Sequence, residues 1–269
     1  MKTAFVVTLL LAFAPVRQVQ AQAVHLAVTG NTAGALTDCG CGEDPAGGLG
    51  RRITVIDSLR KLYPGMLLFD TGDLLSSWQD PDNDSLLVAL YARLGYDAIV
   101  PGEYEFTYGN RFTAQMERLP FVAANLPGYR PHKIFTANQP PVFVTGVLEP
   151  ELFSYRSYEQ RPAELLPVPA SFAVPSQDTL VVVLFHGEED GLRSLAEVLP
   201  AGSLILRGHW HRSFQPNGDA LYQLGNVTVA NPGAGGEYVL FLRREKTWQA
   251  QMIRLNSSIR TKSLNELVR

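Results

Sequence analysis

The sequence MLLFDTGD, residues 66–73, carries the clearest indication of the fold. Four apolar residues run without alternation and are followed at once by the turn sequence Asp70-Thr71-Gly72-Asp73. Such a run is typical of a short strand buried on both faces, and a glycine-containing turn typically ends it. We expect Asp70 to be a buried partner of backbone N–H groups and Asp73 to be available to a ligand.

Five further apolar runs of strand length end in polar or glycine-rich segments: Val24 to Thr29, Asp97 to Val100, Phe121 to Ala124, Thr179 to Phe185 and Ser203 to Leu206. Two segments between the runs have apolar residues at helical spacing: Arg51 to Leu62, and Ser85 to Leu94 with Asp82, Asn83 and Asp84 as candidate caps. Strands that alternate with helices predict an α/β layered domain.

Two other regions, residues 133–145 and 219–242, contain short β-type runs separated by turns, with no helix between them. Consecutive strands without a crossover helix pair antiparallel. The sheet is therefore expected to be at least partly mixed or antiparallel. The sequence has no internal repeat and no low-complexity linker, so the simplest prediction is a single domain over residues 22–269.

The first residues have the three parts of a secretory signal peptide: basic Lys2, an apolar run over residues 5–14, and small residues up to Ala21 and Ala23. About ten apolar residues are too few to cross a membrane core, which needs roughly 20. We expect residues 1–21 to be removed and the protein to be exported, periplasmic or secreted, without stable membrane insertion.

The composition favours small-molecule chemistry. Removal of Lys2 and Arg17 with the signal peptide takes the formal net charge from −3 to −5, and no block of lysines and arginines remains. Because a nucleic-acid groove needs a basic surface, we expect no nucleic-acid partner.

Carboxylates and imidazoles follow several of the predicted strands. In layered α/β proteins, ligands bind beyond the carboxyl ends of the strands. The residues found there include Asp73, Glu103, His186, His209 and His211. His209 and His211 are two residues apart, a spacing that can direct both imidazoles to one metal or to adjacent metals. Asp73 can use both carboxylate oxygens to bridge two cations.

In this order the residues resemble the calcineurin-like metallophosphoesterases, in particular the catalytic domain of bacterial 5'-nucleotidases. That family has five blocks: Asp-x-His, Gly-Asp, Gly-Asn-His-Glu (or Asp), a lone His, and Gly-His-x-His. Three blocks match Gly72-Asp73, His186 and Gly208-His209-Trp210-His211, and residues 121–126 and 229–233 resemble strands of the family. The resemblance implies a layered β-sandwich of two mixed sheets flanked by helices, a divalent-metal site and hydrolysis of phosphate esters.

The other two blocks depart from the family pattern. By position, Asn31 and Ala33 replace the Asp and His of the first block. Glu103 and Tyr104 replace the Asn ligand and the His that assists the leaving group, which makes Tyr104 a candidate catalytic residue. True 5'-nucleotidases also have a C-terminal domain that supplies an aromatic clamp for the base. No counterpart is recognised in this sequence, so nucleotide specificity is not implied.

With these departures from the family's two-metal site, we expect one tightly bound divalent cation, which could be Mn, Zn, Fe or Mg. Its site has four ligands: Asp73, Glu103, His186 and His209. His209 is also a candidate catalytic residue. The family's second site keeps only Asp73 and His211, with Asn31 as a neutral carbonyl ligand. We therefore expect a second cation to bind weakly or not at all.

Cys39 and Cys41 are the only cysteines, and they lie in a glycine-rich insertion directly after the altered first block. An oxidising compartment favours a local disulfide, although a Cys-x-Cys ring is small and strained. Two thiolates could instead bind a metal. A disulfide, a metal or redox role and free thiols all stay open.

The first functional hypothesis is a metal-dependent hydrolase of a small-molecule phosphate ester or related oxyanion ester. Arg51, Arg207 or Arg212 are candidates to hold the substrate's oxygens. The alternative is a non-catalytic protein that binds a metal or an anion on a degenerate phosphoesterase scaffold, because the Asp and His of the first block and the His that assists the leaving group are all lost. A third hypothesis gives Cys39 and Cys41 a thiol or sulfur-transfer role beside the metal.

Overall fold

The structure is a computed structural model that describes residues 23–38, 40, 42–109, 113–209, 220–262 and 266. The predicted signal peptide therefore lies outside the described residues. So do Cys39, Cys41, His211 and Arg212, which the sequence analysis singled out.

The first of two mixed β-sheets has five strands in the order β11-β10-β1-β2-β3. In this sheet β1, β2 and β3 are parallel, while β10 runs antiparallel to both β1 and β11. The strand bounds are β1 (Val24–Thr29), β2 (Leu67–Asp70), β3 (Ala98–Ile99), β10 (Tyr238–Arg244) and β11 (Trp248–Arg254).

The second sheet has six strands in the order β4-β5-β6-β7-β9-β8. Its four central strands are parallel, and the edge strands β4 and β8 are antiparallel to their neighbours. The bounds are β4 (His132–Phe135), β5 (Val142–Leu148), β6 (Leu180–His186), β7 (Leu204–Arg207), β8 (Leu221–Leu224) and β9 (Val227–Ala230).

Both predicted helices form, and further helical segments accompany them. The α-helices are α1 (Leu49–Leu62), α2 (Pro81–Leu94), α3 (Thr113–Met116) and α4 (Glu189–Val198); the 3₁₀ turns are η1 (Glu103–Phe106), η3 (Pro150–Phe153) and η4 (Tyr158–Gln160). The cap prediction for α2 is wrong by a few residues. The side chain of Asp80 accepts the N–H of Asn83, because Pro81 fixes the first helical position and the cap must precede it.

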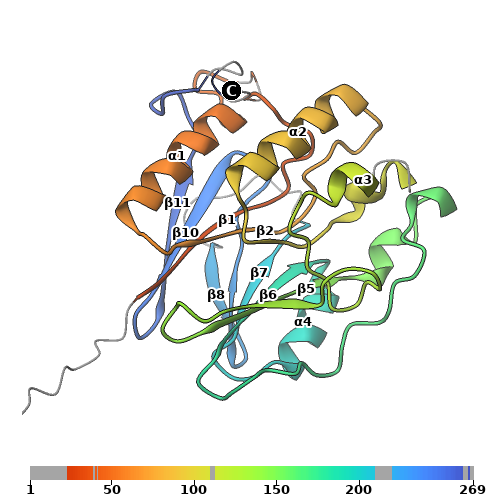
Figure 1. Ribbon diagram of the computed structural model, residues 1–269, viewed down its shortest axis with the longest axis vertical. Coiled ribbons are helices and arrows are strands. Elements are labelled where there is room, and N and C mark those ends of the chain that lie inside the picture. The colour runs from red at the N-terminus through yellow and green to blue at the C-terminus, as the bar shows by residue number, and fades with distance from the viewer. Residues whose placement is uncertain are drawn as a thin grey trace, which may run out of the picture.

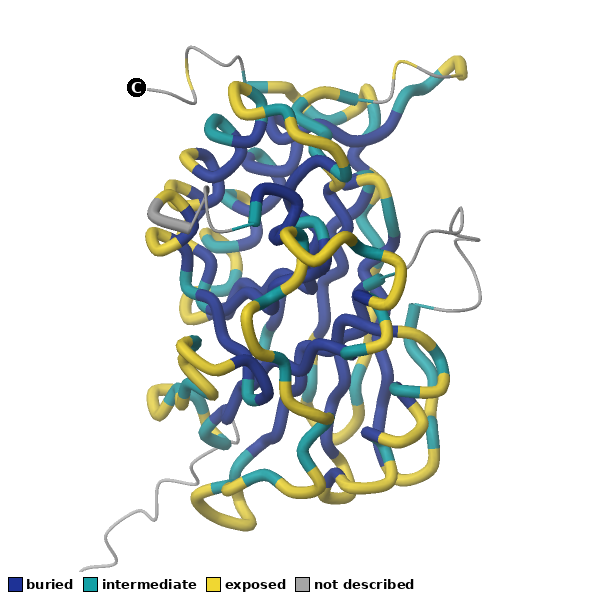
Figure 2. The backbone as a smooth tube through the Cα atoms, turned by 90° about the vertical axis from the view of Figure 1, so that its right-hand side faces the viewer, coloured by how far each residue is buried: buried dark blue, intermediate teal, exposed yellow. Residues whose placement is uncertain are grey.

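The two sheets pack face to face and helices cover their outer faces, which confirms the predicted layered α/β sandwich (Figure 1). Alternate residues of a strand point to opposite faces of its sheet and so pack against different layers. In β6, Val182 and Leu184 face the other sheet, whereas Val183 and Phe185 pack against α4. Helices α1 and α2 cover the five-stranded sheet. The buried positions run through the strands, and exposed positions concentrate in the connecting loops (Figure 2).

One predicted strand, Phe121 to Ala124, does not form. Its residues make only isolated bridges, because successive N–H groups bond to different parts of the fold. The N–H of Val122 donates to Ile99 of the five-stranded sheet, and that of Ala124 donates to Gly146 of the six-stranded sheet. The segment therefore joins the two sheets.

Within the part of the chain that the structure describes, no helix combines the length and apolarity needed to cross a membrane.

Candidate metal centre

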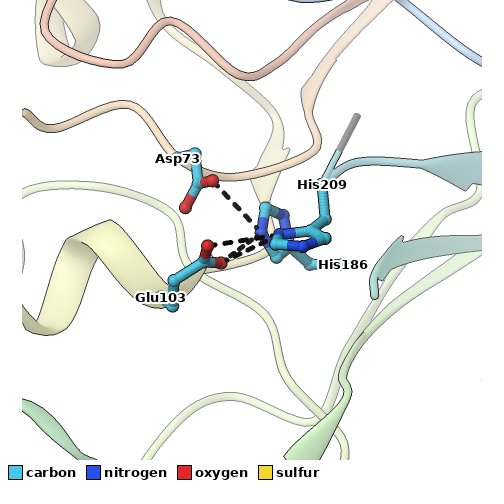
Figure 3. A group of neighbouring side chains, drawn as sticks. All are labelled: Asp73, Glu103, His186 and His209. Carbon is cyan, nitrogen blue, oxygen red and sulfur yellow. Dashed lines mark hydrogen bonds and ion pairs between the residues drawn. The ribbon is translucent and has the colours of Figure 1, made fainter. Parts of the chain in front are cut away.

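Four side chains meet at one edge of the sandwich: Asp73, Glu103, His186 and His209. Asp73 and Glu103 follow β2 and β3 of the five-stranded sheet, while His186 ends β6 and His209 follows β7 of the six-stranded sheet. One potential ligand atom from each residue lies within 4.8 Å of the others. Figure 3 shows the two carboxylates facing the two imidazoles across a small space. The fold thus gathers the four residues predicted for the tight site.

His186 is fixed at both ring nitrogens. Its Nδ1 lies 2.7 Å from the backbone oxygen of Thr71, a partner that can only accept, so Nδ1 carries a proton and donates. Its Nε2 faces the cluster, 2.9 Å from Glu103 Oε2 and 3.4 Å from Asp73 Oδ2. Because Nδ1 carries the proton that it donates to Thr71, Nε2 is the nitrogen of this buried imidazole that can bind a metal.

His209 closes the outer side of the cluster. Its Nδ1 lies 3.2 Å from the Glu103 carboxylate, and its side chain is 10% exposed, so it forms the rim. The backbone of His209 has a positive φ of 53°. A non-glycine residue rarely adopts this conformation, and its occurrence here directs the imidazole toward the other three side chains.

The charges in the cluster support one another. Burial alone opposes ionisation of Glu103, but hydrogen bonds from His186 and His209 lower the pKa of its carboxyl. Burial likewise opposes protonation of His186, yet Asp73 and then Glu103 raise the pKa of the imidazole. The two carboxylates therefore favour positive charge at this point, which a divalent cation would supply in place of the imidazole proton.

The donor set fits a divalent metal. Two imidazole nitrogens and two carboxylates are a common ligand set for Zn, Fe and Mn. Asp73 Oδ2 is fully buried and has no hydrogen-bond partner among the described residues, although burying an unpaired carboxylate oxygen is costly. A cation held by Asp73, Glu103, His186 and His209 would satisfy this oxygen.

The altered first block forms a turn next to Gly72 and Asp73, although its side chains are not the ligands of the family pattern. Asn31 and Ala33 have positive φ angles of 48° and 49°, and their N–H groups donate to the backbone oxygens of Gly72 and Asp73. The side-chain amide of Asn31 donates to the oxygen of Gly233, and its Oδ1 has no partner among the described residues. Asn31 therefore has one buried neutral oxygen without a hydrogen-bond partner, and the methyl group of Ala33 offers no ligand.

The structure also shows buried carboxylates around the cluster. Asp70 accepts the Gly72 N–H and the hydroxyl of Thr29, as predicted for a partner of the backbone. Glu105, which sequence reasoning missed, accepts the N–H groups of Asp73, Leu74, Leu75 and Gly102. It is the acidic last position of the altered third block, and that position was its only sequence signal. Burial, together with the Asp73 carboxylate, raises the pKa of Glu105 to about 8.

Comparison with protein-family models gives no match, and no curated protein sequence matches the chain. Solved structures do match. The sulfate thiohydrolase SoxB of Thermus thermophilus superimposes with a TM-score of 0.75 at 14% identity, covering 91% of this chain and 59% of its own. YfkN of Bacillus subtilis, a calcineurin-like phosphoesterase, superimposes with a TM-score of 0.70 at 19% identity, and the match covers 91% of this chain and 94% of YfkN.

The chain has the fold of the calcineurin-like phosphoesterases. A 5'-nucleotidase precursor from Thermus thermophilus gives a further match, with a TM-score of 0.70 at 18% identity, covering 92% of this chain and 58% of its own. The chain thus spans less than two thirds of SoxB and of that nucleotidase. Phosphoesterases of this fold use divalent metals, and the four-residue cluster is a possible site for one.

Proposed function

We propose that the protein is a metal-dependent hydrolase of small-molecule phosphate esters or related oxyanion esters. The observation that carries the proposal is the convergence of Asp73, Glu103, His186 and His209, in which the buried Asp73 Oδ2 has no hydrogen-bond partner among the described residues. The structural neighbours, a phosphoesterase, a 5'-nucleotidase and a sulfate thiohydrolase, point to the same range of substrates. One tightly bound cation, export and a single domain over residues 22–269 are parts of this proposal.

Each residue has a chemical part in this proposal. A divalent cation would supply Lewis-acid chemistry that makes water acidic enough to attack an ester near neutral pH. Asp73, Glu103, His186 and His209 would hold it, and the proton on His186 Nδ1 keeps that ring oriented toward it. Tyr104 is held next to the cluster, because its backbone N–H donates to Asp73 Oδ1 at 3.1 Å and it follows Glu103 directly in the chain.

The arginines proposed from sequence are held elsewhere. Arg51 pairs with Asp38 at 3.0 Å and donates to the backbone oxygen of Pro45. Arg207 pairs with Glu189 at 2.7 Å. Both are almost fully buried by these partners, so neither is placed to bind a substrate. Arg212 lies outside the described residues.

Arg156 is the better candidate for substrate binding. Its guanidinium carbon lies 5.2 Å from the centre of the Tyr104 ring. The segment that carries it is tied to η1, because Phe153 packs edge-on against Phe106 with ring centres 5.3 Å apart. Among the described residues, no ion pair joins Arg156 to a carboxylate. A cation beside an acidic metal cluster can hold the oxygens of an anionic ester.

Replacing Arg156 by alanine is expected to raise KM for a phosphate monoester about tenfold with a smaller change in kcat, because a charge-assisted contact to the bound ester is lost. Steady-state kinetics of the Mn²⁺-loaded protein measures this. Arg193→Ala, which removes an exposed arginine on α4, is the matched control. Equal KM values for the two variants would exclude Arg156 from substrate binding.

Tyr104 is a weak proton donor, so we expect the protein to prefer esters whose leaving group needs little protonation. Burial and then the carboxylates of Asp73 and Glu103 raise its pKa to about 12, far from neutral pH. Since a matched acid contributes at least about 100-fold, nitrophenyl phosphate should be hydrolysed at least that much faster than methyl phosphate. Tyr104→His should narrow the difference. Equal rates on the two esters, with chemistry rate-limiting, would contradict the prediction.

The alternative, a non-catalytic metal- or anion-binding protein, is favoured by one observation: Ala33 occupies a ligand position of the first block without offering a ligand. Phosphatase assays with Mn²⁺, with and without reductant, separate the two functions. Turnover that is absent from Asp73→Ala supports the hydrolase. Tight metal binding without turnover of any phosphate or sulfate ester supports the alternative.

A further inference from the structure

The two ring nitrogens of His209 face two different carboxylates. Nδ1 lies 3.2 Å from Glu103, inside the cluster, and Nε2 lies 3.2 Å from Glu188 Oε1, outside it. A neutral imidazole carries one proton, and the nitrogen that binds a metal must be the one without it. Both carboxylates accept when ionised, so Glu103 alone would favour the proton on Nδ1. Glu188 shifts the proton toward Nε2, which leaves the electron pair of Nδ1 free for a metal.

We propose that Glu188 is a positioning residue that holds His209 in the tautomer and orientation needed to bind a divalent cation through Nδ1. The inference rests on the metal site of the proposed function and adds a residue to it. Carboxylates in this relation to a metal-binding histidine typically account for 10–100-fold in metal affinity. The sequence offered no pattern for Glu188, because its partner reaches it only through the fold.

Hydrogen bonds fix the position of the Glu188 backbone. Its N–H donates to Oε2 of Glu149, a carboxylate that is only 5% exposed. Gly187 and Gly191 leave room for that carboxylate, since a Cβ at either position would lie within 2.6 Å of a Glu149 oxygen. The N–H of Glu149 in turn donates to the oxygen of His186. The loop that presents Glu188 is therefore connected to one of the candidate ligands.

The neighbouring Glu189 shows what Glu188 would do as an ordinary surface charge. Glu189 pairs with Arg207 at 2.7 Å and with Arg193 at 2.8 Å. Glu188 directs Oε1 to His209 and keeps Oε2 4.0 Å from Arg207. Its side chain is 63% exposed, so its own contribution to folding is small. The expected effect is therefore on His209, at the low end of the 10–100-fold range.

The test compares Glu188→Ala, Glu188→Gln and the control Glu189→Ala. Competition with a fluorescent chelator gives the dissociation constant of Mn²⁺ or Zn²⁺. Glu188→Ala should weaken binding about tenfold, Glu188→Gln less because its amide oxygen still accepts, and Glu189→Ala less than about twofold. Unchanged binding in Glu188→Ala, or equal losses in both alanine variants, would overturn the proposal.

A second readout needs no metal. The ¹⁵N spectrum of histidine-labelled, metal-free protein above pH 8 reports the tautomer of His209, whose signal is assigned by its loss in His209→Gln. Because Glu103 also accepts from Nδ1, we expect both tautomers, with a larger share protonated on Nε2 in the wild type than in Glu188→Ala. The same mixture in both proteins would refute the role of Glu188. If the wild type shows the larger Nε2 share but binds no metal, the proposed function fails while the positioning by Glu188 stands.

Discussion

Replacing Asp73 by alanine is expected to remove the tightly held cation, so that metal analysis of dialysed protein falls from about one equivalent to near zero. Asp73 supplies the buried oxygen that lacks another partner, and it lies 3.4 Å from Nε2 of His186. Ester hydrolysis should fall at least about 1,000-fold, equivalent to about 4 kcal/mol of transition-state stabilisation.

The control for Asp73 is Asp190→Ala, which removes an exposed carboxylate at the start of α4. It should keep both the metal and the activity. His211→Ala should also lower the metal content little, because the second site has too few ligands to hold a cation tightly. Two tightly held equivalents in a variant with Cys39 and Cys41 both replaced by serine would contradict this account of the site.

Replacing Glu105 by alanine should destabilise the metal-free protein by at least about 4 kcal/mol, because it leaves four buried backbone N–H groups without an acceptor. Such a loss is a large part of the unfolding free energy of a typical domain, which is about 5–15 kcal/mol. Urea denaturation measures it. Glu117→Ala, at an exposed position, should change the unfolding free energy by less than about 0.5 kcal/mol. A loss below about 1 kcal/mol in Glu105→Ala would show that water replaces the carboxylate.

The sequence predicted those parts of the fold that local patterns determine. Strand β1 has the predicted bounds, Val24–Thr29, because Val24, Leu26, Ala27 and Val28 form an apolar run broken only by His25. Helix α4 was missed because Leu192 and Leu195 are its only two buried residues, too few to show a helical period. The failed strand at 121–124 is apolar for another reason, since it crosses between two sheets.

Some residues of the candidate site could also be predicted from local patterns, and others could not. Asp73 and His186 could be predicted because each ends or follows an apolar run, where a strand must deliver it to the sheet edge. The roles of Glu105 and Glu188 depend on partners elsewhere in the chain, namely four backbone N–H groups and one imidazole nitrogen. Glu105 had only its position in the third block as a sequence signal, and Glu188 had none.

The candidate ligands are divided evenly between the two sheets, two from each side of the sandwich. A bound cation would therefore act as a cross-link between the layers, in addition to the apolar core that holds them together. By thermodynamic linkage, free metal at 100 times its dissociation constant adds about 2.7 kcal/mol to the unfolding free energy. The protein would then be more resistant to unfolding where metal is plentiful and more easily opened where it is scarce.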